Sequence, residues 1–291
     1  MLLLIDLSYF IFYRYYAVYN WYKKQNQPAE AGEAGESGAA GAASEAETAA
    51  AVKPKNQSVM SDPLFIEKYD KLFEQIISSL VKKHEISWNK VYFAKDCTRD
   101  DIWRMSHYPA YKQSREERLD TFDKMIFYHS IAILIPKLQK KYGGCHTLSI
   151  DHMEADDIIA VTKKYVRDLE PEREIIIVTN DNDYIQLIDD YTLIVNLQGY
   201  DLKSRIRGTP SEYLKQKIIL GDKADNIPSI AKKIGEKTSF KLSNDTEALM
   251  ALFKKNPDAK KQYDLNTLLI SFDQIPDKYQ KLVIESYIKT I

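Results

Sequence analysis

Acidic side chains follow several short apolar runs along this 291-residue sequence, as in LLLID and EIIIVTNDND. The candidate cation ligands are the carboxylates of Asp6, Asp96, Glu154, Asp156, Asp157, Asp181, Asp183, Asp222 and Asp225. Oxygen donors without His or Cys partners favour Mg²⁺ or Mn²⁺ over zinc. Two such ions about 4 Å apart can activate water and stabilise both oxygens of an in-line displacement at phosphorus. The acids therefore predict metal-assisted phosphodiester hydrolysis.

Each acidic group also has an ordinary structural explanation. The acids at residues 154–157 suit a helix N-terminus, and Asp181 and Asp183 suit a turn. Asp6 is harder to explain in this way, because a carboxylate between LLLI and LSYFIF would be buried without a partner. Carboxylates gathered in one crevice would repel one another strongly without cations, so their joint occurrence carries the prediction.

The elements that must position these acids are predicted to alternate between strand and helix. We expect strands at residues 2–5, 91–95, 146–150, 174–179 and 193–197, and helices at 7–22, 63–84, 119–141 and 154–169. This alternation implies an α/β fold with a mostly parallel central sheet and helices on both faces. The carboxyl ends of parallel strands form one edge of a sheet, so acids far apart in sequence would converge there.

Three regions differ in composition. Residues 1–28 and 59–209 form the predicted α/β core, interrupted by a low-complexity insertion at 29–58. Most of the insertion lacks large apolar residues and is expected to be flexible. A partner-binding helix is the alternative there, because Ala and Glu favour helix. Residues 210–291 have a nearly all-helical pattern rich in Lys, which predicts a second, helical lobe.

The net charge of −1 at pH 7 hides an uneven distribution. The insertion carries five Glu in residues 29–51 and no basic residue there, so setting these aside leaves 37 of the 42 acidic residues against 41 basic ones. Bound cations would offset the charge of the candidate ligands among them. A basic surface beside an acidic site is expected for an enzyme that grips phosphates.

Several other kinds of protein are disfavoured. The two cysteines, Cys97 and Cys145, have no CxxC or Cys/His spacing, which argues against a zinc site. None of the five His residues lies in a motif that would orient it for Ser/His/Asp catalysis. The apolar N-terminus is interrupted by Asp6 and Arg14, so a buried strand and helix explain it better than a membrane anchor or signal peptide. A soluble intracellular protein is expected.

Five acidic blocks occur in a fixed order. They are IDLSYF with YRYYA, DCTRDDIWRMSHYPAYKQSR, MEADDIIAV, TNDNDYIQL and GDKADNIPSI, followed by YDLNTLLISFDQIP. Together they resemble the flap endonuclease and 5′–3′ exonuclease superfamily, most closely the RNase H-type 5′ nucleases of tailed phages. Apart from the insertion, the resemblance spans nearly the whole chain. It implies a PIN-like α/β fold, a helical arch at about residues 104–135 and a C-terminal helical lobe.

The resemblance implies a structure-specific 5′ nuclease of DNA replication or repair, acting as a 5′-flap endonuclease and 5′–3′ exonuclease, with RNase H-like primer removal as a further activity. Branched or 5′-flap DNA and RNA–DNA hybrid would be its partners, and it would be a monomer that binds no membrane. It also implies two Mg²⁺ ions, for which Mn²⁺ could substitute. The first would be surrounded by Asp6, Asp96, Glu154, Asp156 and Asp157. The second would be served by Asp181, Asp183, Asp222 and Asp225.

The YKQSR segment resembles a family motif that lies over the active site. Tyr111, Lys112 and Arg115 would carry it, with Lys112 and Arg115 clamping the scissile phosphate and offsetting transition-state charge. The solvated face of a charged helix is the alternative. Together with Arg104, this motif would line an arch that receives single-stranded 5′ ends through stacking and phosphate contacts.

The helical lobe contains IAKKIGEKT, which resembles the family's helix-hairpin-helix element. Its turn at Gly235, with Lys232, Lys233 and Lys237, would bind a duplex phosphate, and K⁺ could support the turn. Lys233 takes the place of the first glycine in the family's pattern. An ordinary helix end with solvated lysines is the alternative.

Two other functions remain open. A catalytically inert module that binds branched DNA could use the same scaffold, although its carboxylates would repel phosphate. A phosphatase with an aspartyl nucleophile at Asp6 is the other. Such enzymes have a second Asp two residues later, where this chain has Ser8.

Overall fold

A five-stranded parallel sheet forms the centre of the molecule. The structure is a computed structural model that describes residues 1–26, 58–113 and 122–291. Nearly all of the predicted insertion and Arg115 therefore lie outside the described residues. The strands are β1 (Leu2–Asp6), β2 (Val91–Lys95), β3 (His146–Ser149), β4 (Ile175–Val178) and β5 (Thr192–Val195). All five lie within two residues of the predicted ranges.

Strand β1 lies in the middle of the sheet. The order is β3-β2-β1-β4-β5, and every neighbouring pair is parallel. Asp6 lies opposite Ala94 of β2, and Ile5 lies opposite Val178 of β4. The carboxyl ends of β1, β2 and β4 therefore reach the same edge, as the α/β prediction requires. The predicted fold class is confirmed.

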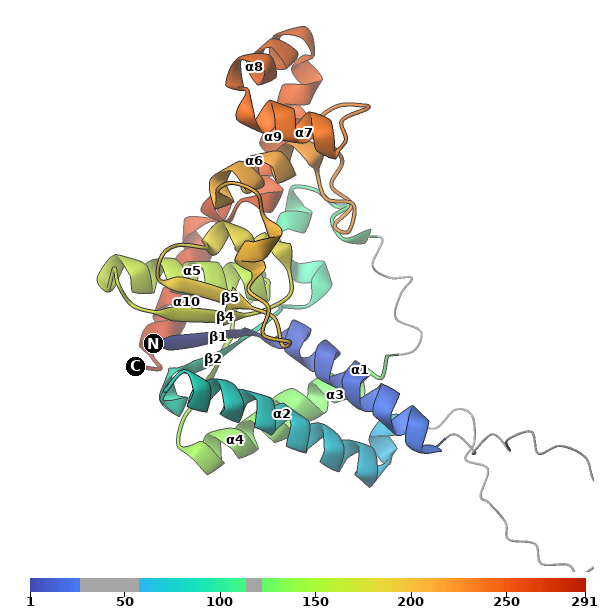
Figure 1. Ribbon diagram of the computed structural model, residues 1–291, viewed down its shortest axis with the longest axis vertical. Coiled ribbons are helices and arrows are strands. Elements are labelled where there is room, and N and C mark those ends of the chain that lie inside the picture. The colour runs from blue at the N-terminus through green and yellow to red at the C-terminus, as the bar shows by residue number, and fades with distance from the viewer. Residues whose placement is uncertain (27–57, 114–121) are drawn as a thin grey trace, which may run out of the picture.

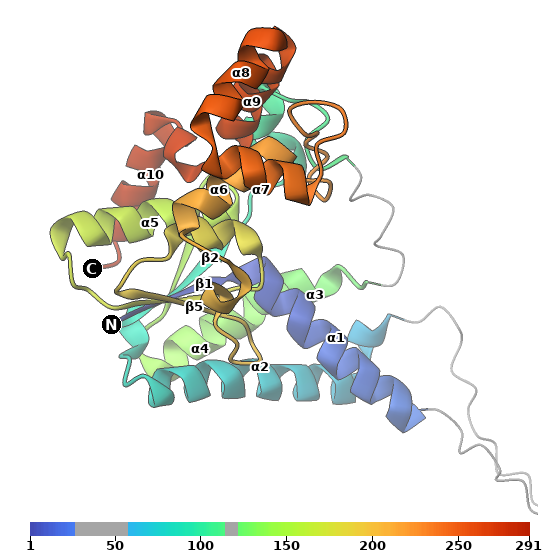
Figure 2. The ribbon, with the colours of Figure 1, turned by 45° about the horizontal axis from the view of Figure 1, so that its top comes forward.

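Helices cover both faces of the sheet (Figures 1 and 2). Leu3 and Ile5 of β1 pack against one helical layer, whereas Leu2 and Leu4 pack against the other, and all four are at most 1% exposed. A strand buried on both faces must be apolar throughout, which explains the LLLI run. The first layer contains α1 (Leu7–Asn26), α2 (Pro63–Lys83) and α4 (Ile135–Tyr142); the second contains α5 (Ala155–Leu169) and α10 (Asp277–Ile288).

Helix α2 shows how local sequence sets a boundary and a buried face. The Asp62 side chain accepts a hydrogen bond from the Leu64 backbone N–H at 3.0 Å, and Pro63 occupies the first helical turn, where its missing N–H costs nothing. Apolar side chains then recur every four residues and face the core. They are Phe65, Tyr69, Phe73, Ile77 and Val81.

The helical segment before β3 contains a widened turn. Helix α3 (Met125–Tyr128) continues through a π-helical turn at His129–Leu134 into α4. Pro136 accounts for the widening, because proline has no N–H and its ring would clash with the carbonyl four residues earlier in a regular α-helix. Gly143 follows the last residue of α4, and its left-handed φ of 64° ends the helix.

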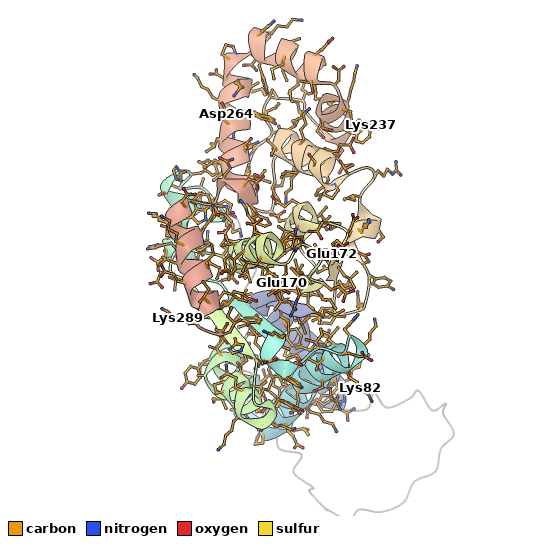
Figure 3. The ribbon with its side chains drawn as sticks, turned by 90° about the vertical axis from the view of Figure 1, so that its left-hand side faces the viewer. Lys82, Glu170, Glu172, Lys237, Asp264 and Lys289 are labelled. Carbon is orange, nitrogen blue, oxygen red and sulfur yellow. The ribbon has the colours of Figure 1, made fainter. Side chains whose placement is uncertain are left out.

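A helical lobe extends from one end of the sheet. It contains α6 (Pro210–Leu220), α7 (Glu236–Asn244), α8 (Thr246–Lys255) and α9 (Pro257–Ile270). Buried apolar residues give it a core of its own: Ile219, Ile230, Leu242, Leu249, Phe253 and Ala259. Figure 3 shows Lys237 and Asp264 on this lobe, at the opposite end of the molecule from Lys82 of α2.

Helix α10 leaves the lobe and returns to the sheet. Its Val283 and Tyr287 are buried in the same cluster as Leu2 and Tyr92. The boundary at residue 210 stays a prediction, but this last helix belongs to the layer that covers the sheet. In the described ranges, no helix combines the length and the apolar character needed to cross a bilayer.

The two ends of the chain lie side by side (Figures 1 and 2). The Leu2 backbone N–H donates to the Glu174 carbonyl at 2.9 Å, which fixes the start of β1. The Thr290 hydroxyl lies 3.1 Å from the Tyr92 hydroxyl near the start of β2. Both ends are thus held at the amino-terminal side of the sheet.

Gly221 makes a turn that only glycine can adopt without strain. Its φ is 77°, and a Cβ there would lie 2.4 Å from the Ile227 carbonyl oxygen and 2.5 Å from the Pro228 backbone. Gly221→Ala is expected to lower the free energy of unfolding by about 3 kcal/mol or more in chemical denaturation.

Gly235→Ala is the matched control for this substitution. A Cβ at Gly235 would have no atom within 4 Å, and φ there is −113°, so we expect a loss below about 1 kcal/mol. If the two variants lost equal free energies of unfolding, the backbone of Ile227 and Pro228 would not lie close to Gly221 as the structure shows.

Candidate metal centre

Hydrogen bonds hold Asp6 and Asp96 at the carboxyl edge of the sheet. The Asp6 carboxylate accepts from the Tyr9 backbone N–H at 3.0 Å, and from the hydroxyls of Thr179 and Tyr184 at 3.1 and 3.2 Å. These donors come from α1 and from the segment after β4, so strands β1 and β4 meet at Asp6. The sequence predicted the position of this acid but not its donors.

Asp96 joins three elements in the same way. Its carboxylate accepts from the Ser8 hydroxyl at the start of α1 and from the Ala155 backbone N–H at 2.8 Å, at the start of α5. The N-terminus of α5 therefore points toward the end of β2. The positive end of a helix favours an acid at this position.

The remaining acids form two compact groups. One carboxylate oxygen from each of Glu154, Asp156 and Asp157 lies within 4.8 Å of the others, and we name these three residues the first cluster. The same holds for Asp183, Asp222 and Asp225, which we name the second cluster. Asp181 caps the 3₁₀ helix Asn182–Leu187 by accepting from the Asp183 backbone N–H at 3.0 Å.

The carboxylates strongly influence one another's protonation. Burial, followed by the charges of Asp96 and Asp181, raises the pKa of Asp6 to about 7. Burial also raises the pKa of Asp96. Burial and the neighbouring charges of Glu154 and Asp157 raise the pKa of Asp156 well above its usual range. Such carboxylates lack sufficient positive charge nearby, and a divalent cation bound by hard oxygen donors would supply it. The residues therefore fit Mg²⁺ or Mn²⁺.

Arg104 is a correction to the sequence analysis. It was expected to contact nucleic acid, but its side chain is buried, with only 1% of the residue exposed. It donates to both oxygens of Asp157 at 2.6 and 2.8 Å, to Glu154 at 3.0 Å and to the Leu269 carbonyl at 2.7 Å. An arginine enclosed in this way cannot reach a DNA strand.

Asp157 is the main partner of the Arg104 guanidinium. Its oxygens receive the two arginine hydrogen bonds and a third from Trp103 Nε1 at 2.8 Å. Asp157 was predicted as a metal ligand, and that role stays a prediction. In this structure it is fully buried, and its ion pair ties the start of α5 to the 103–104 segment. Glu154 is paired as well, with Arg104 and Lys112, whereas burial and the charges of Glu154 and Asp157 raise the pKa of Asp156.

Tyr111 is a second correction. It was expected to stack on single-stranded bases, but it is 3% exposed. Its hydroxyl donates to Glu154 Oε2 at 3.0 Å and lies 3.4 Å from Asp225 Oδ2, so it links the two clusters. A buried ring of this kind offers no stacking surface.

Lys112 contacts an acid of each cluster, and its predicted role at the phosphate stays a prediction. Its ammonium forms an ion pair with Glu154 and lies 3.8 Å from Asp225 Oδ2. Its backbone is left-handed, with φ of 57°, and its N–H donates to the Asp225 carbonyl at 2.9 Å. Although burial opposes the effect, Lys112 and Arg104 lower the pKa of Glu154.

Lys217 is a site residue that the sequence analysis missed. It lies in the last turn of α6, and its ammonium contacts Asp183 and lies 2.9 Å from Asp222 Oδ2. Although burial opposes the effect, Lys217 lowers the pKa of Asp222. A lysine one helical turn before the GD pair of GDKADN was the available signal.

The predicted hairpin residues lie on the surface of the helical lobe. Lys232, Lys233, Gly235 and Lys237 are exposed, in the segment that leads into α7 and in its first turn. Lys233 has a left-handed φ of 66°, so the turn adopts the backbone conformation that favours glycine although a lysine stands there. Nucleic-acid contact by these residues stays a prediction.

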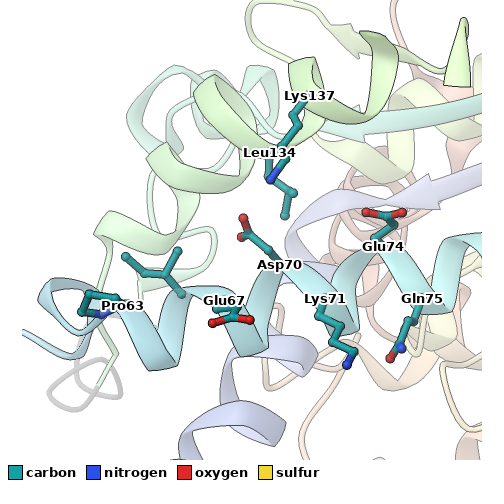
Figure 4. Close-up of a pocket in the computed structure, with 9 residues that line it drawn as sticks. Pro63, Glu67, Asp70, Lys71, Glu74, Gln75, Leu134 and Lys137 are labelled. Atoms are coloured by element: carbon teal, nitrogen blue, oxygen red, sulfur yellow. The ribbon is translucent and has the colours of Figure 1, made fainter. Parts of the chain in front are cut away.

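A groove of about 690 Å³ lies elsewhere, between α2 and α4 (Figure 4). Two of the acids that line it have partners: Asp70 lies 2.6 Å from His129 Nε2, and Glu74 lies 2.5 Å from Lys141 Nζ. Among the described residues that line the groove, none is a predicted ligand. The groove is therefore separate from the candidate metal centre.

The pKa of Asp6 predicts a pH dependence of metal-free stability. The native state holds this proton up to about pH 7, whereas an unfolded Asp loses it near pH 4. The free energy of unfolding should therefore fall as pH rises between these values, by roughly 2–4 kcal/mol. Asp6→Asn should reduce that fall in thermal unfolding with EDTA from pH 4 to pH 8.

Asp189→Asn is a control of opposite sign for Asp6→Asn. Although burial opposes it, Lys163 lowers the pKa of Asp189 to about 2, so this substitution should destabilise the protein at neutral pH. If the free energy of unfolding of the metal-free protein rose between pH 4 and pH 7, the pKa of Asp6 would not be raised by its burial and by neighbouring carboxylates.

The burial of Arg104 predicts a loss of stability when it is replaced. Arg104→Met leaves Asp157 buried without its cation and should lower the free energy of unfolding by about 3–5 kcal/mol. Arg205→Met is the control, because Arg205 is exposed and bonds to Asn182 at 2.8 Å; its loss should be below about 1 kcal/mol. Similar values in denaturation would contradict a structural role for Arg104.

Several proteins of known activity are similar to this chain. Residues 68–218 match the family model described as 5′-3′ exonuclease, N-terminal resolvase-like domain. DNA polymerase I of Lactococcus lactis is 28% identical over 220 residues, which are 72% of this chain and 24% of that protein, so the chain spans about a quarter of the polymerase. Ribonuclease H of Enterobacteria phage T4 is 28% identical over 236 residues, 74% of this chain and 75% of that protein.

The fold has solved counterparts. The bacteriophage T5 D15 flap endonuclease, solved with DNA and metal ions, superposes with a TM-score of 0.62 at 16% identity and covers 98% of both chains. The metal-bound T5 D15 protein gives 0.61 with the same identity and coverage. At this identity the likeness shows that the fold is shared across the full length.

Proposed function

Because the chain belongs to the 5′-3′ exonuclease family through its N-terminal resolvase-like domain, we propose that it is a structure-specific 5′ nuclease. It hydrolyses phosphodiester bonds in branched or 5′-flap DNA, acting as flap endonuclease and 5′–3′ exonuclease. The observation that carries the proposal is the meeting of Asp6, Asp96 and the first cluster at one edge of the sheet. RNA–DNA hybrid is a further substrate, in keeping with the related phage ribonuclease H.

Two groups of acids would hold two Mg²⁺ ions, with Mn²⁺ as a substitute. The first ion would be surrounded by Asp6, Asp96, Glu154, Asp156 and Asp157, and the second would be held by Asp181, Asp183, Asp222 and Asp225. When bound, such ions supply Lewis acidity at the phosphate and activate water for in-line attack. The donors of Ser8, Thr179, Tyr184 and the start of α5 would keep Asp6 and Asp96 in position before substrate arrives.

Basic side chains of the protein would bind the scissile phosphate. The Lys112 ammonium lies between Glu154 and Asp225, where a scissile phosphate would approach the acids. On releasing Glu154 it would bind a phosphate oxygen and stabilise the charge that develops there. Arg115 would act with it. Lys232, Lys233, Gly235 and Lys237 would hold the duplex, with K⁺ at their turn, and the protein would act as a soluble intracellular monomer.

Product sizing on 5′-labelled flap, nicked and RNA–DNA substrates tests the proposal. Cleavage is expected with Mg²⁺ or Mn²⁺ and should be lost in excess EDTA. Asp156→Asn should lower the cleavage rate at least ~10²-fold while DNA binding is kept, because it removes a ligand that acts on the transition state. Asp151→Asn, at an exposed acid of the same loop, is the control and should cleave normally.

Two results would contradict the proposal. Full cleavage in excess EDTA would exclude a metal-dependent mechanism. Tight binding of flap DNA with metal present and no product would instead favour an inert branched-DNA binding module.

A further inference from the structure

We propose that Lys217 is the resident counter-ion of the second cluster and that its ammonium must leave Asp183 and Asp222 before a divalent ion binds there. The inference rests on the proposed function only in taking this cluster as a metal site. Lys217 then sets how tightly that ion is held, because every ion that enters has to displace it.

The geometry places the lysine against two of the three acids in the second cluster. Its ammonium contacts Asp183 and lies 2.9 Å from Asp222 Oδ2, and its side chain is only 13% exposed. The three carboxylates of the cluster lie within 4.8 Å of one another, so an ion bound by them would lie within reach of the same oxygens. The ammonium thus occupies carboxylate oxygens that an ion needs.

The two cations cannot share these oxygens. An ammonium and a divalent ion a few ångströms apart in a partly buried site repel each other strongly. Ammonium is a compact charge on a flexible four-carbon stem, so it can swing away while the stem stays attached to α6. The neighbouring Ile218 and Ile219 are buried, which holds the helix itself in place.

One of the acids that Lys217 contacts, Asp222, is also held by a backbone hydrogen bond. The Ala224 N–H donates to Asp222 Oδ1 at 2.8 Å, and the turn at Gly221 sets the direction of this loop. Asp183 lies in the first turn of the 3₁₀ helix that Asp181 caps, and this cap holds its backbone. Because these backbone contacts do not involve the lysine, the flexible Lys217 side chain is the part that would move when the cation changes.

Mn²⁺ binding measured by electron paramagnetic resonance, without nucleic acid, tests the exchange. Lys217→Met keeps the aliphatic stem and removes the charge, so the weaker of two Mn²⁺ sites should bind at least about tenfold more tightly than in the wild type. Lys217→Arg keeps a cation and should stay within about threefold of the wild type. Lys215→Met removes a charge from the same helix, where Lys215 bonds to Thr246 at 3.2 Å, and should leave affinity unchanged.

A second measurement uses the wild-type protein alone. Amine-reactive labelling followed by peptide mass spectrometry should modify Lys217 slowly in EDTA and several-fold faster in saturating Mg²⁺, with Lys215 as internal reference. Unchanged or slower labelling of Lys217 with Mg²⁺ would overturn the exchange, and so would unchanged or weaker Mn²⁺ binding in Lys217→Met. If the wild type bound no Mn²⁺ at all, the proposed metal centre would be wrong. If it bound two ions and their affinities did not change when Lys217 was replaced, this inference alone would be wrong.

Discussion

Mutual repulsion among carboxylates at one edge of the parallel sheet is the constraint on which the rest of the structure depends. Strand β1 carries Asp6 to the centre of that edge, and the ends of β2 and β4 bring further acids beside it. An arrangement of this kind costs stability in the absence of cations. It persists because apolar packing on both faces of the sheet fixes where the strands end.

The chain offsets part of this repulsion with its own cations, which differ in kind. Arg104 is enclosed and makes several hydrogen bonds at once, so it acts as a permanent part of the framework around Asp157. Lys112 and Lys217 reach Glu154 and Asp222 through flexible stems. A planar guanidinium suits a fixed ion pair, and an ammonium suits a contact that must be given up.

Much of the fold and the position of the acids could be predicted from the sequence, because both follow from local patterns. The LLLI run predicts a strand buried on both faces, and a parallel sheet then places Asp6 at its edge. The environment of Arg104 could not be predicted, since α9 supplies one of its partners through the Leu269 carbonyl, 165 residues away. For Lys217 the sequence offered only its closeness to Asp222; its other partner, Asp183, follows β4, far from α6 in sequence.

The two neighbouring chain ends have a practical consequence. They lie at the amino-terminal side of the sheet, and the carboxylates lie at the opposite edge. A biotin or dye attached at either end would therefore orient the molecule in nearly the same way on a glass surface, with its acidic edge facing the solution. Single-molecule tethering could thus use either terminus and leave the route to the acids open.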